Sequence, residues 1–412
     1  MTNLQTRQIL ESLRTGVPIR EAVQLVGSGQ PGLEERFTDL LDDIRVGKPR
    51  PNSGFVFFGD FGTGKSHALE FFSSAAVNKN FVVSRATISK NLQLSNHRAV
   101  LSQLMSQMST TEHREEALAR ILDDSNSKGF DYSDLVAWCE TEVGAGRLSS
   151  IYKEIASKLH MLRYGTEEFD KLMSYFAGSA SQVEIKKAVG APRADVPTAE
   201  TRSLQTLQFL SQLFLYLGYN GWVLLFDELE LIRVIGSQAA RVARGKSYAA
   251  LTDWFGLDNK NSVRRIATVG CMTTSFVADI IDDQGQNSWN DSQLVPAALA
   301  VSRSSELVHP ATTAMNFLRD QDSDTLLQLK WPNKSAKVKL QALIRELYDE
   351  AYGTTSPDLE LVGEEYESIR IFIRRWIANW DLVRHGRTDS VSILAVKQNF
   401  DVPDEDSDES EE

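Results

Sequence analysis

The chain has 412 residues, with 44 basic and 56 acidic side chains and a formal net charge of −12. Residues 401–412 hold eight of the acids and no base, so the rest carries only −4; this near-neutral body argues against a strongly basic DNA-binding module. The sequence contains no run of eighteen apolar residues that would predict a membrane span. The first residues lack the apolar core of a signal peptide, and there are only two cysteines. We therefore expect a protein of the reducing cytoplasm, with no membrane segment and with room for two or three domains.

The most informative motif is a glycine-rich loop between an apolar segment and an apolar helix. Residues 54–58 are apolar, residues 59–66 follow the pattern Gly-x-x-x-x-Gly-Lys-Ser, and a helix with apolar positions at 68–72 follows. The pattern predicts a P-loop, because glycines let successive N–H groups turn toward phosphate oxygens and the following helix adds its positive N-terminus. Lys65 is expected to reach the β- and γ-phosphates, and Ser66 to ligate Mg²⁺. A glycine turn that binds nothing would explain neither side chain.

The whole stretch is the candidate nucleotide-binding segment. Within it, we expect His67 to be a residue of the following helix rather than a catalyst. The candidate residues are Gly59, Asp60, Phe61, Gly62, Thr63, Gly64, Lys65, Ser66 and His67.

A second acidic element lies far downstream. Residues 222–228 read Trp-Val-Leu-Leu-Phe-Asp-Glu, which predicts a buried parallel strand that ends in two carboxylates. Beside a P-loop this is a Walker B element: Asp227 is expected to hold Mg²⁺, directly or through water, and Glu228 to orient and deprotonate the attacking water. The alternative is a strand with acidic residues at its exposed end. Because no guanine-selecting motif is found, we expect ATP as the nucleotide and ATP hydrolysis as the reaction.

A third apolar strand, residues 265–272, ends in Thr273 and Thr274. AAA+ and related ATPases place at this position the sensor that polarises the attacking water, so either threonine is a candidate for that role. The alternative is that the threonines cap the helix that follows.

Residues 231–246 contain no acid and carry four bases, namely Arg233, Arg241, Arg244 and Lys246. Arg241 and Arg244 are three residues apart and therefore share a helical face. Two functional interpretations stay open: an arginine that reaches the γ-phosphate bound to a neighbouring subunit, with Arg244 as the candidate, or a loop that lines a nucleic-acid channel. The third interpretation is a solvated basic helix.

These elements predict an α/β fold, namely an AAA+-like P-loop three-layer sandwich with a parallel sheet. More than a hundred residues separate the second strand (81–86) from the Walker B strand, which implies a helical insertion. Its clearest helix carries an apolar stripe at 148–162, interpreted as core or as a docking face for a partner. Residues 282 to about 300 are expected to form a polar loop. The predicted segments are an N-terminal helical element (1–52), the ATPase core in two parts (53–94 and 201–332), the insertion (95–200), a helical lid (333–395) and a disordered acidic tail (396–412).

The predicted lid holds two amphipathic helices, at 336–352 and 365–384. Arg370 and Arg374 lie one turn apart at the start of the second helix, where a sensor arginine could touch the γ-phosphate. Arg370 is the candidate, and surface salt bridging is the alternative. The acidic tail is interpreted as a solubilising segment, or as a mimic of nucleic acid that occupies a basic surface.

The motifs together resemble the ATP-binding proteins of BREX-type bacteriophage-exclusion gene clusters, over residues 7 to 384. The sequence departs from the expected pattern only mildly, at Phe61, Ser66 and Trp222, where tyrosine, threonine and an aliphatic residue are expected. The resemblance is carried by residues 13–18 (Leu-Arg-Thr-Gly-Val-Pro), 59–66, 217–222 leading into 227–230 (Asp-Glu-Leu-Glu), 241–251, and 370–374 (Arg-Ile-Phe-Ile-Arg).

The resemblance implies an AAA+-like ATPase of a prokaryotic anti-phage system that works beside a helicase, nuclease or other effector. Our leading hypothesis is that ATP binding drives self-assembly into a homo-oligomer, around DNA, and that hydrolysis resets it. A second hypothesis is an adaptor whose bound nucleotide is structural and whose insertion recruits the effector. A third is a helicase or transposition loader.

Overall fold

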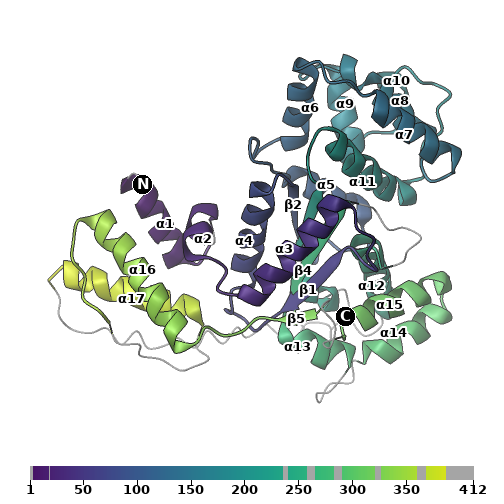
Figure 1. Ribbon diagram of the computed structural model, residues 1–412. Coiled ribbons are helices and arrows are strands. Elements are labelled where there is room, and N and C mark those ends of the chain that lie inside the picture. Colours follow the sequence, from purple (N-terminus) through teal and green to yellow (C-terminus); the bar gives the residue numbers. More distant parts are fainter. Residues whose placement is uncertain are drawn as a thin grey trace, which may run out of the picture. The chain divides into compact units, whose positions relative to one another are not determined.

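The computed structural model describes residues 3–17, 19–234, 240–257, 265–282, 290–320, 326–359 and 368–386 (Figure 1). The chain divides into two compact units. The sheet unit is residues 23–331, and the terminal unit combines residues 1–22 with residues 332–412.

A parallel five-stranded sheet forms the centre of the sheet unit. The strand order is β2-β3-β4-β1-β5, and every neighbouring pair is parallel, so all the carboxyl ends lie at one edge. β4 is between β1 and β3, so its end is flanked by the ends of the strands that precede the glycine loop and the acidic pair. The strands are β1 (Gly54–Phe58), β2 (Val82–Thr87), β3 (Trp222–Asp227), β4 (Ile266–Met272) and β5 (Leu326–Gln328).

Helices cover both faces of the sheet, as the buried strands require. Successive strand residues point to opposite faces: Phe55 and Phe57 belong to one apolar cluster, and Val56 and Phe58 to the other. The first cluster is completed by α3 (Pro31–Val46) and α4 (Lys65–Asn78), and the second by α5 (His97–Ser106), α11 (Ala199–Tyr216) and α12 (Arg241–Phe255), among others. The mixed α/β architecture with a parallel sheet is therefore confirmed.

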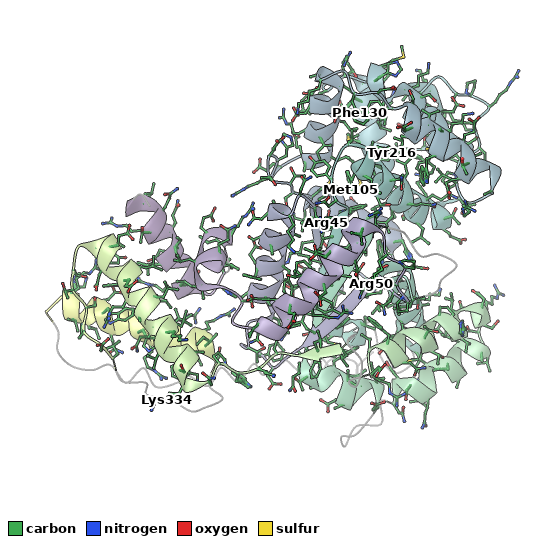
Figure 2. The ribbon with its side chains drawn as sticks, viewed as in Figure 1. Arg45, Arg50, Met105, Phe130, Tyr216 and Lys334 are labelled. Carbon is green, nitrogen blue, oxygen red and sulfur yellow. The ribbon has the colours of Figure 1, made fainter. Side chains whose placement is uncertain are left out.

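Seven α-helices join β2 to β3, in a part of the chain that is described without a gap. The apolar stripe expected there is core, because Ile151, Tyr152 and Ile155 are fully buried. Met105, Phe130 and Tyr216, labelled in Figure 2, pack against the same apolar cluster. Besides α5 and α11, the helices are α6 (Ala117–Ser127), α7 (Ser133–Gly144), α8 (Ser150–Lys158), α9 (Glu167–Phe176) and α10 (Gln182–Ala188).

A helix forms where the sequence predicted a polar loop up to about residue 300. After the short α13 (Thr274–Phe276), α14 (Asp291–Ala300) and α15 (Val308–Phe317) pack on each other and on α12. Val295 and Leu299 lie one turn apart and are buried. The loop prediction is therefore wrong from residue 291 onward. The sequence did not indicate this helix because Pro296 lies inside it, and proline normally argues against a helical interior.

The terminal unit packs α1 (Asn3–Thr15) against α16 (Lys334–Tyr352) and α17 (Ile369–Arg384). Asp381 accepts hydrogen bonds from Arg14 (2.8 Å) and from the Tyr348 hydroxyl (2.6 Å). The first 52 residues are thus divided between the units, since α1 lies here and α3 lies on the sheet, while α2 (Arg20–Val26) crosses the division. The six predicted segments are finer than this division and remain predictions; the acidic tail falls outside the described residues.

No helix among the described residues is long and apolar enough to cross a membrane.

Candidate active site

The loop between β1 and α4 is built around glycines. Gly62 has φ 83° and Gly64 has φ 100°, values that residues with a side chain rarely adopt. A Cβ at Gly59 would lie only 2.6 Å from Oγ1 of Thr63, so the loop closes tightly there. Gly64 precedes α4 without any side-chain cap. The first N–H groups of α4 therefore face the loop, and the helix dipole favours an anion at this end.

Lys65 lies folded over the loop. Its Nζ donates hydrogen bonds to the carbonyl oxygens of Gly59 (3.0 Å) and Asp60 (3.3 Å), and it lies 5.1 Å from the centre of the Phe61 ring. The ammonium is thus held at the mouth of the loop, at the N-terminus of α4. A phosphate there would meet a cation and backbone donors together.

The next two residues of α4 differ in their surroundings. Ser66 is half-buried in the first turn. His67 Nε2 forms a 2.7 Å hydrogen bond with the carbonyl oxygen of Gly27, and burial lowers the pKa of the imidazole. His67 therefore contacts the segment after α2 as a neutral side chain, in accordance with a helix residue; a contact with nucleotide stays a prediction.

Asp227, at the end of β3, is almost fully buried and accepts hydrogen bonds from three donors among the described residues. Its Oδ1 accepts the Cys271 thiol (3.0 Å) and the Glu228 N–H (3.1 Å), and its Oδ2 forms an ion pair with Arg85 of β2. A buried carboxylate needs such partners to remain ionised. The carboxylate is therefore fixed in orientation by β2, β4 and its own chain.

Glu228 has a left-handed backbone, with φ 62°. This conformation is unfavourable for a side-chain-bearing residue, and such strain concentrates at functional sites. Burial, and then the neighbouring Asp227, raise the pKa of the Glu228 carboxyl, while Lys65 lowers it. A carboxylate with a raised pKa is a better proton acceptor.

Thr273 and Thr274 follow β4. Both Oγ1 atoms are buried, and neither has a hydrogen-bond partner among the described residues. Thr273 is the residue that precedes α13, yet its side chain forms no capping hydrogen bond. The capping interpretation is therefore not what the structure shows, and a buried hydroxyl without a partner calls for a ligand or water.

The strand order brings these groups to one edge of the sheet. Gly59 N–H donates to the carbonyl oxygen of Met272 (3.2 Å), so the glycine loop begins beside Thr273. Asp227 follows Phe226, which pairs with Gly270 of β4. Lys65 is close enough to lower the pKa of Glu228. This edge therefore carries an uncapped helix N-terminus, a lysine, two carboxylates and two buried hydroxyls. Together these groups fit a nucleoside triphosphate with Mg²⁺.

Sequence reasoning assigned no role to Glu230 or Arg85. Glu230 is only 2% exposed, and neither of its carboxylate oxygens has a partner in another residue that the structure describes. Burial and then Glu228 raise its pKa to about 7, against the effect of Lys65. The sequence offered only weak signals for them, namely an acid two residues after the Asp227–Glu228 pair and a base inside an apolar strand.

Glu230 predicts a pH dependence of stability. Its folded pKa of about 7 exceeds the ordinary 4.5, so its protonated form stabilises the fold below about pH 4.5 and this contribution is lost as the pH rises through 7. The difference in unfolding free energy between Glu230→Gln and wild type should therefore grow by about 2 to 3 kcal/mol, in favour of the variant, when the pH is raised from 5 to 8. Urea unfolding at both pH values tests this, with the exposed Glu200→Gln as control; a pH-independent difference would contradict it.

The two candidate arginines, Arg244 and Arg370, have partners within their own units. The Arg244 guanidinium is 1% exposed and forms a bidentate pair with Asp291, Nε to Oδ2 at 2.9 Å and Nη2 to Oδ1 at 2.7 Å. The expectation that Arg244 reaches a neighbouring subunit is corrected, because its guanidinium is buried and paired with an acid of the same chain. The sequence did not reveal this pair, since the two residues are 47 positions apart. Arg370, in the terminal unit, donates to the carbonyl oxygen of Gly16 (3.1 Å); its sensor role stays a prediction.

Residues 1–128 match the family model of the BREX system ATP-binding protein BrxC/D. The first 128 residues of the chain are therefore similar to the BREX-type ATP-binding proteins. The matched part includes β1, the glycine loop, α4 and β2, and it ends before the Asp227–Glu228 pair. No protein of curated function and no solved structure matches the chain. The resemblance found in the motifs is thus confirmed, and the chain is related to an ATP-binding component of BREX defence.

Proposed function

We propose that this BREX-type protein binds ATP with Mg²⁺ and hydrolyses it, as an AAA+-like P-loop ATPase. The observation that carries the proposal is the meeting of the glycine loop, the acidic pair and two buried hydroxyls without partners at one sheet edge. The family match supports ATP binding. Hydrolysis, the AAA+ assignment and the residue roles are our inference.

Binding is assigned to the loop and its helix. The N–H groups at the start of α4 and the Lys65 ammonium hold the phosphates. Ser66 and Asp227 would hold Mg²⁺, since hydroxyl and carboxylate oxygens suit this hard cation. When bound, Mg²⁺ neutralises charge on the β- and γ-phosphates.

Hydrolysis is assigned to Glu228, with Thr273 or Thr274 as the sensor. The strained backbone fixes the direction of the Glu228 side chain, and its raised pKa suits it to accept a proton from water. The two hydroxyls lie between the loop and the acidic pair, where they can orient the water or the γ-phosphate by hydrogen bonds.

Lys65→Ala tests the binding site. Loss of a charged hydrogen bond to phosphate is worth about 1.5–3 kcal/mol, so the dissociation constant of a fluorescent ATP analogue should rise at least about tenfold. The matched control is Lys79→Ala, which removes the same charge at the far end of α4. Nζ of Lys79 lies there 3.8 Å from Oδ2 of Asp42. Equal affinity of the Lys65 variant and wild type would refute the proposed site.

The proposal extends to the cellular role. BREX membership implies other components of the system as partners; we propose an ATP-dependent homo-oligomer in the cytoplasm that acts on DNA with a helicase or nuclease. Light scattering of Glu228→Gln should show an ATP-dependent increase in mass, with and without double-stranded DNA. A mass that is the same with and without ATP would contradict assembly but not ATP binding.

A further inference from the structure

One charged side chain connects three elements of the candidate active site. Arg85, in β2 two residues before its end, pairs through Nη2 with Oδ2 of Asp227, and its Nη1 lies 3.6 Å from Oε2 of Glu70 on α4. β2 and β3 are in register, with Arg85 beside Leu225 and Thr87 beside Asp227. The guanidinium therefore reaches forward along the sheet to the carboxylate that we assign to Mg²⁺.

The acceptor positions of Asp227 are nearly all in use. A carboxylate offers about four lone-pair positions; Oδ1 accepts the Cys271 thiol and the Glu228 N–H, and Oδ2 accepts Arg85. Arg85 is the only one of these three donors that carries a full charge, and charge-assisted hydrogen bonds are about twice as strong as neutral ones. A divalent cation at Asp227 therefore acts on the same carboxylate as the guanidinium.

Glu70 gives the guanidinium a second acceptor. The Glu70 and Arg85 side chains are each about a quarter exposed, whereas Asp227 is 6% exposed. A shift of Arg85 toward Glu70 would keep it in an ion pair. The arrangement thus allows Asp227 to change partner without leaving the arginine unpaired.

We propose that Arg85 and the divalent cation compete for Asp227, so that Arg85 keeps the free cation from binding strongly and the cation binds together with nucleotide. Arg85 is a positioning residue in this proposal, which rests on the proposed function because it takes Asp227 as the metal ligand. Phosphate oxygens from the nucleotide supply the further ligands with which the cation outcompetes the guanidinium.

A purely structural role for Arg85 makes a different prediction. If Arg85 only neutralised a buried carboxylate, its removal would lower stability and leave cation affinity unchanged or weaker. Competition predicts instead that removal strengthens cation binding in the absence of nucleotide. The two roles therefore differ in the sign of the change in affinity.

The experiment titrates the full chain with Mn²⁺ without nucleotide at pH 8, and follows free Mn²⁺ by electron paramagnetic resonance. Arg85→Gln should bind one Mn²⁺ at least about fivefold more tightly than wild type, and adding Asp227→Asn should abolish the gain. Lys79→Gln is the charge-matched control and should behave as wild type. Unchanged or weaker Mn²⁺ binding by Arg85→Gln, or an equal gain in Lys79→Gln, would overturn the proposal.

Two additions keep the test decisive. If Arg85→Gln does not fold, Arg85→Lys is used instead, because it retains the charge. The shorter lysine side chain should give a smaller gain in Mn²⁺ affinity. Thermal unfolding should then show that Mn²⁺ raises the unfolding temperature of Arg85→Lys more than that of wild type, and an equal rise in both would refute competition. Binding of a fluorescent ATP analogue to wild type is measured in parallel. If the analogue fails to bind while Arg85→Gln gains Mn²⁺, the proposed function fails alone; the reverse pattern refutes the role of Arg85 alone.

Discussion

Glu228→Gln is expected to lower the rate of ATP hydrolysis by at least about 100-fold while ATP binding is retained. Glutamine keeps the length of the side chain but cannot accept a proton, and a positioned general base contributes roughly 10²- to 10⁴-fold. The left-handed backbone at this position and the burial that raises the carboxyl pKa both indicate that Glu228 is fixed for such a task. The measurement is phosphate release under saturating Mg·ATP.

The control for this variant is Glu140→Gln, an exposed carboxylate of α7 that pairs with Lys153 at 2.7 Å. It should hydrolyse ATP at the wild-type rate. If Glu228→Gln kept more than about a third of the wild-type rate, Glu228 would not be the base, because the lost factor would fall far below the usual contribution.

Arg244→Met is expected to lower the free energy of unfolding by about 3–5 kcal/mol, because it leaves the Asp291 carboxylate buried without its counter-ion. Asp291 is fully buried, and besides Arg244 it accepts a hydrogen bond from the Tyr248 hydroxyl at 3.0 Å. The pair joins α12 to α14, two helices with extensive contact. Urea unfolding followed by tryptophan fluorescence measures the loss.

The double variant Arg244→Met with Asp291→Leu separates the charge from the packing. Removing both charges of a buried pair is often neutral or stabilising, so the double variant should recover most of the stability that Arg244→Met loses. A double variant as unstable as the single one would show that the shape of the side chains, rather than an unpaired charge, sets the effect.

The strands, the loop and most helices were predictable from sequence, because each has a local signal. Residues 222–228 are apolar up to two acids, and residues 59–66 carry the glycine pattern at fixed spacing. The helix at residues 291–300 lacked such a signal, because Pro296 and a short polar start concealed the burial of Val295 and Leu299. It is held by tertiary contacts with α12 and α15.

The charged pairs of the site were not predictable, for a physical reason. Arg244 and Asp291 are 47 residues apart, and Arg85 and Asp227 are 142 apart, so only the folded sheet brings each pair together. A basic helical face and a solitary arginine in a strand look the same in sequence whether they face solvent or a buried acid. Likewise, the burial of Glu230 and its raised pKa depend on neighbours from several elements.

Hydrogen–deuterium exchange with and without Mg·ATP tests the central claim most directly, because it locates the bound nucleotide along the chain. ATP should slow exchange in residues 59–68, where the backbone N–H groups of the loop and of α4 are assigned to the phosphates, and Lys65→Ala should lose most of this protection. Protection in these residues that depends on Lys65 would support the assigned site. ATP that binds without protecting residues 59–68, or that protects them equally in Lys65→Ala, would contradict it.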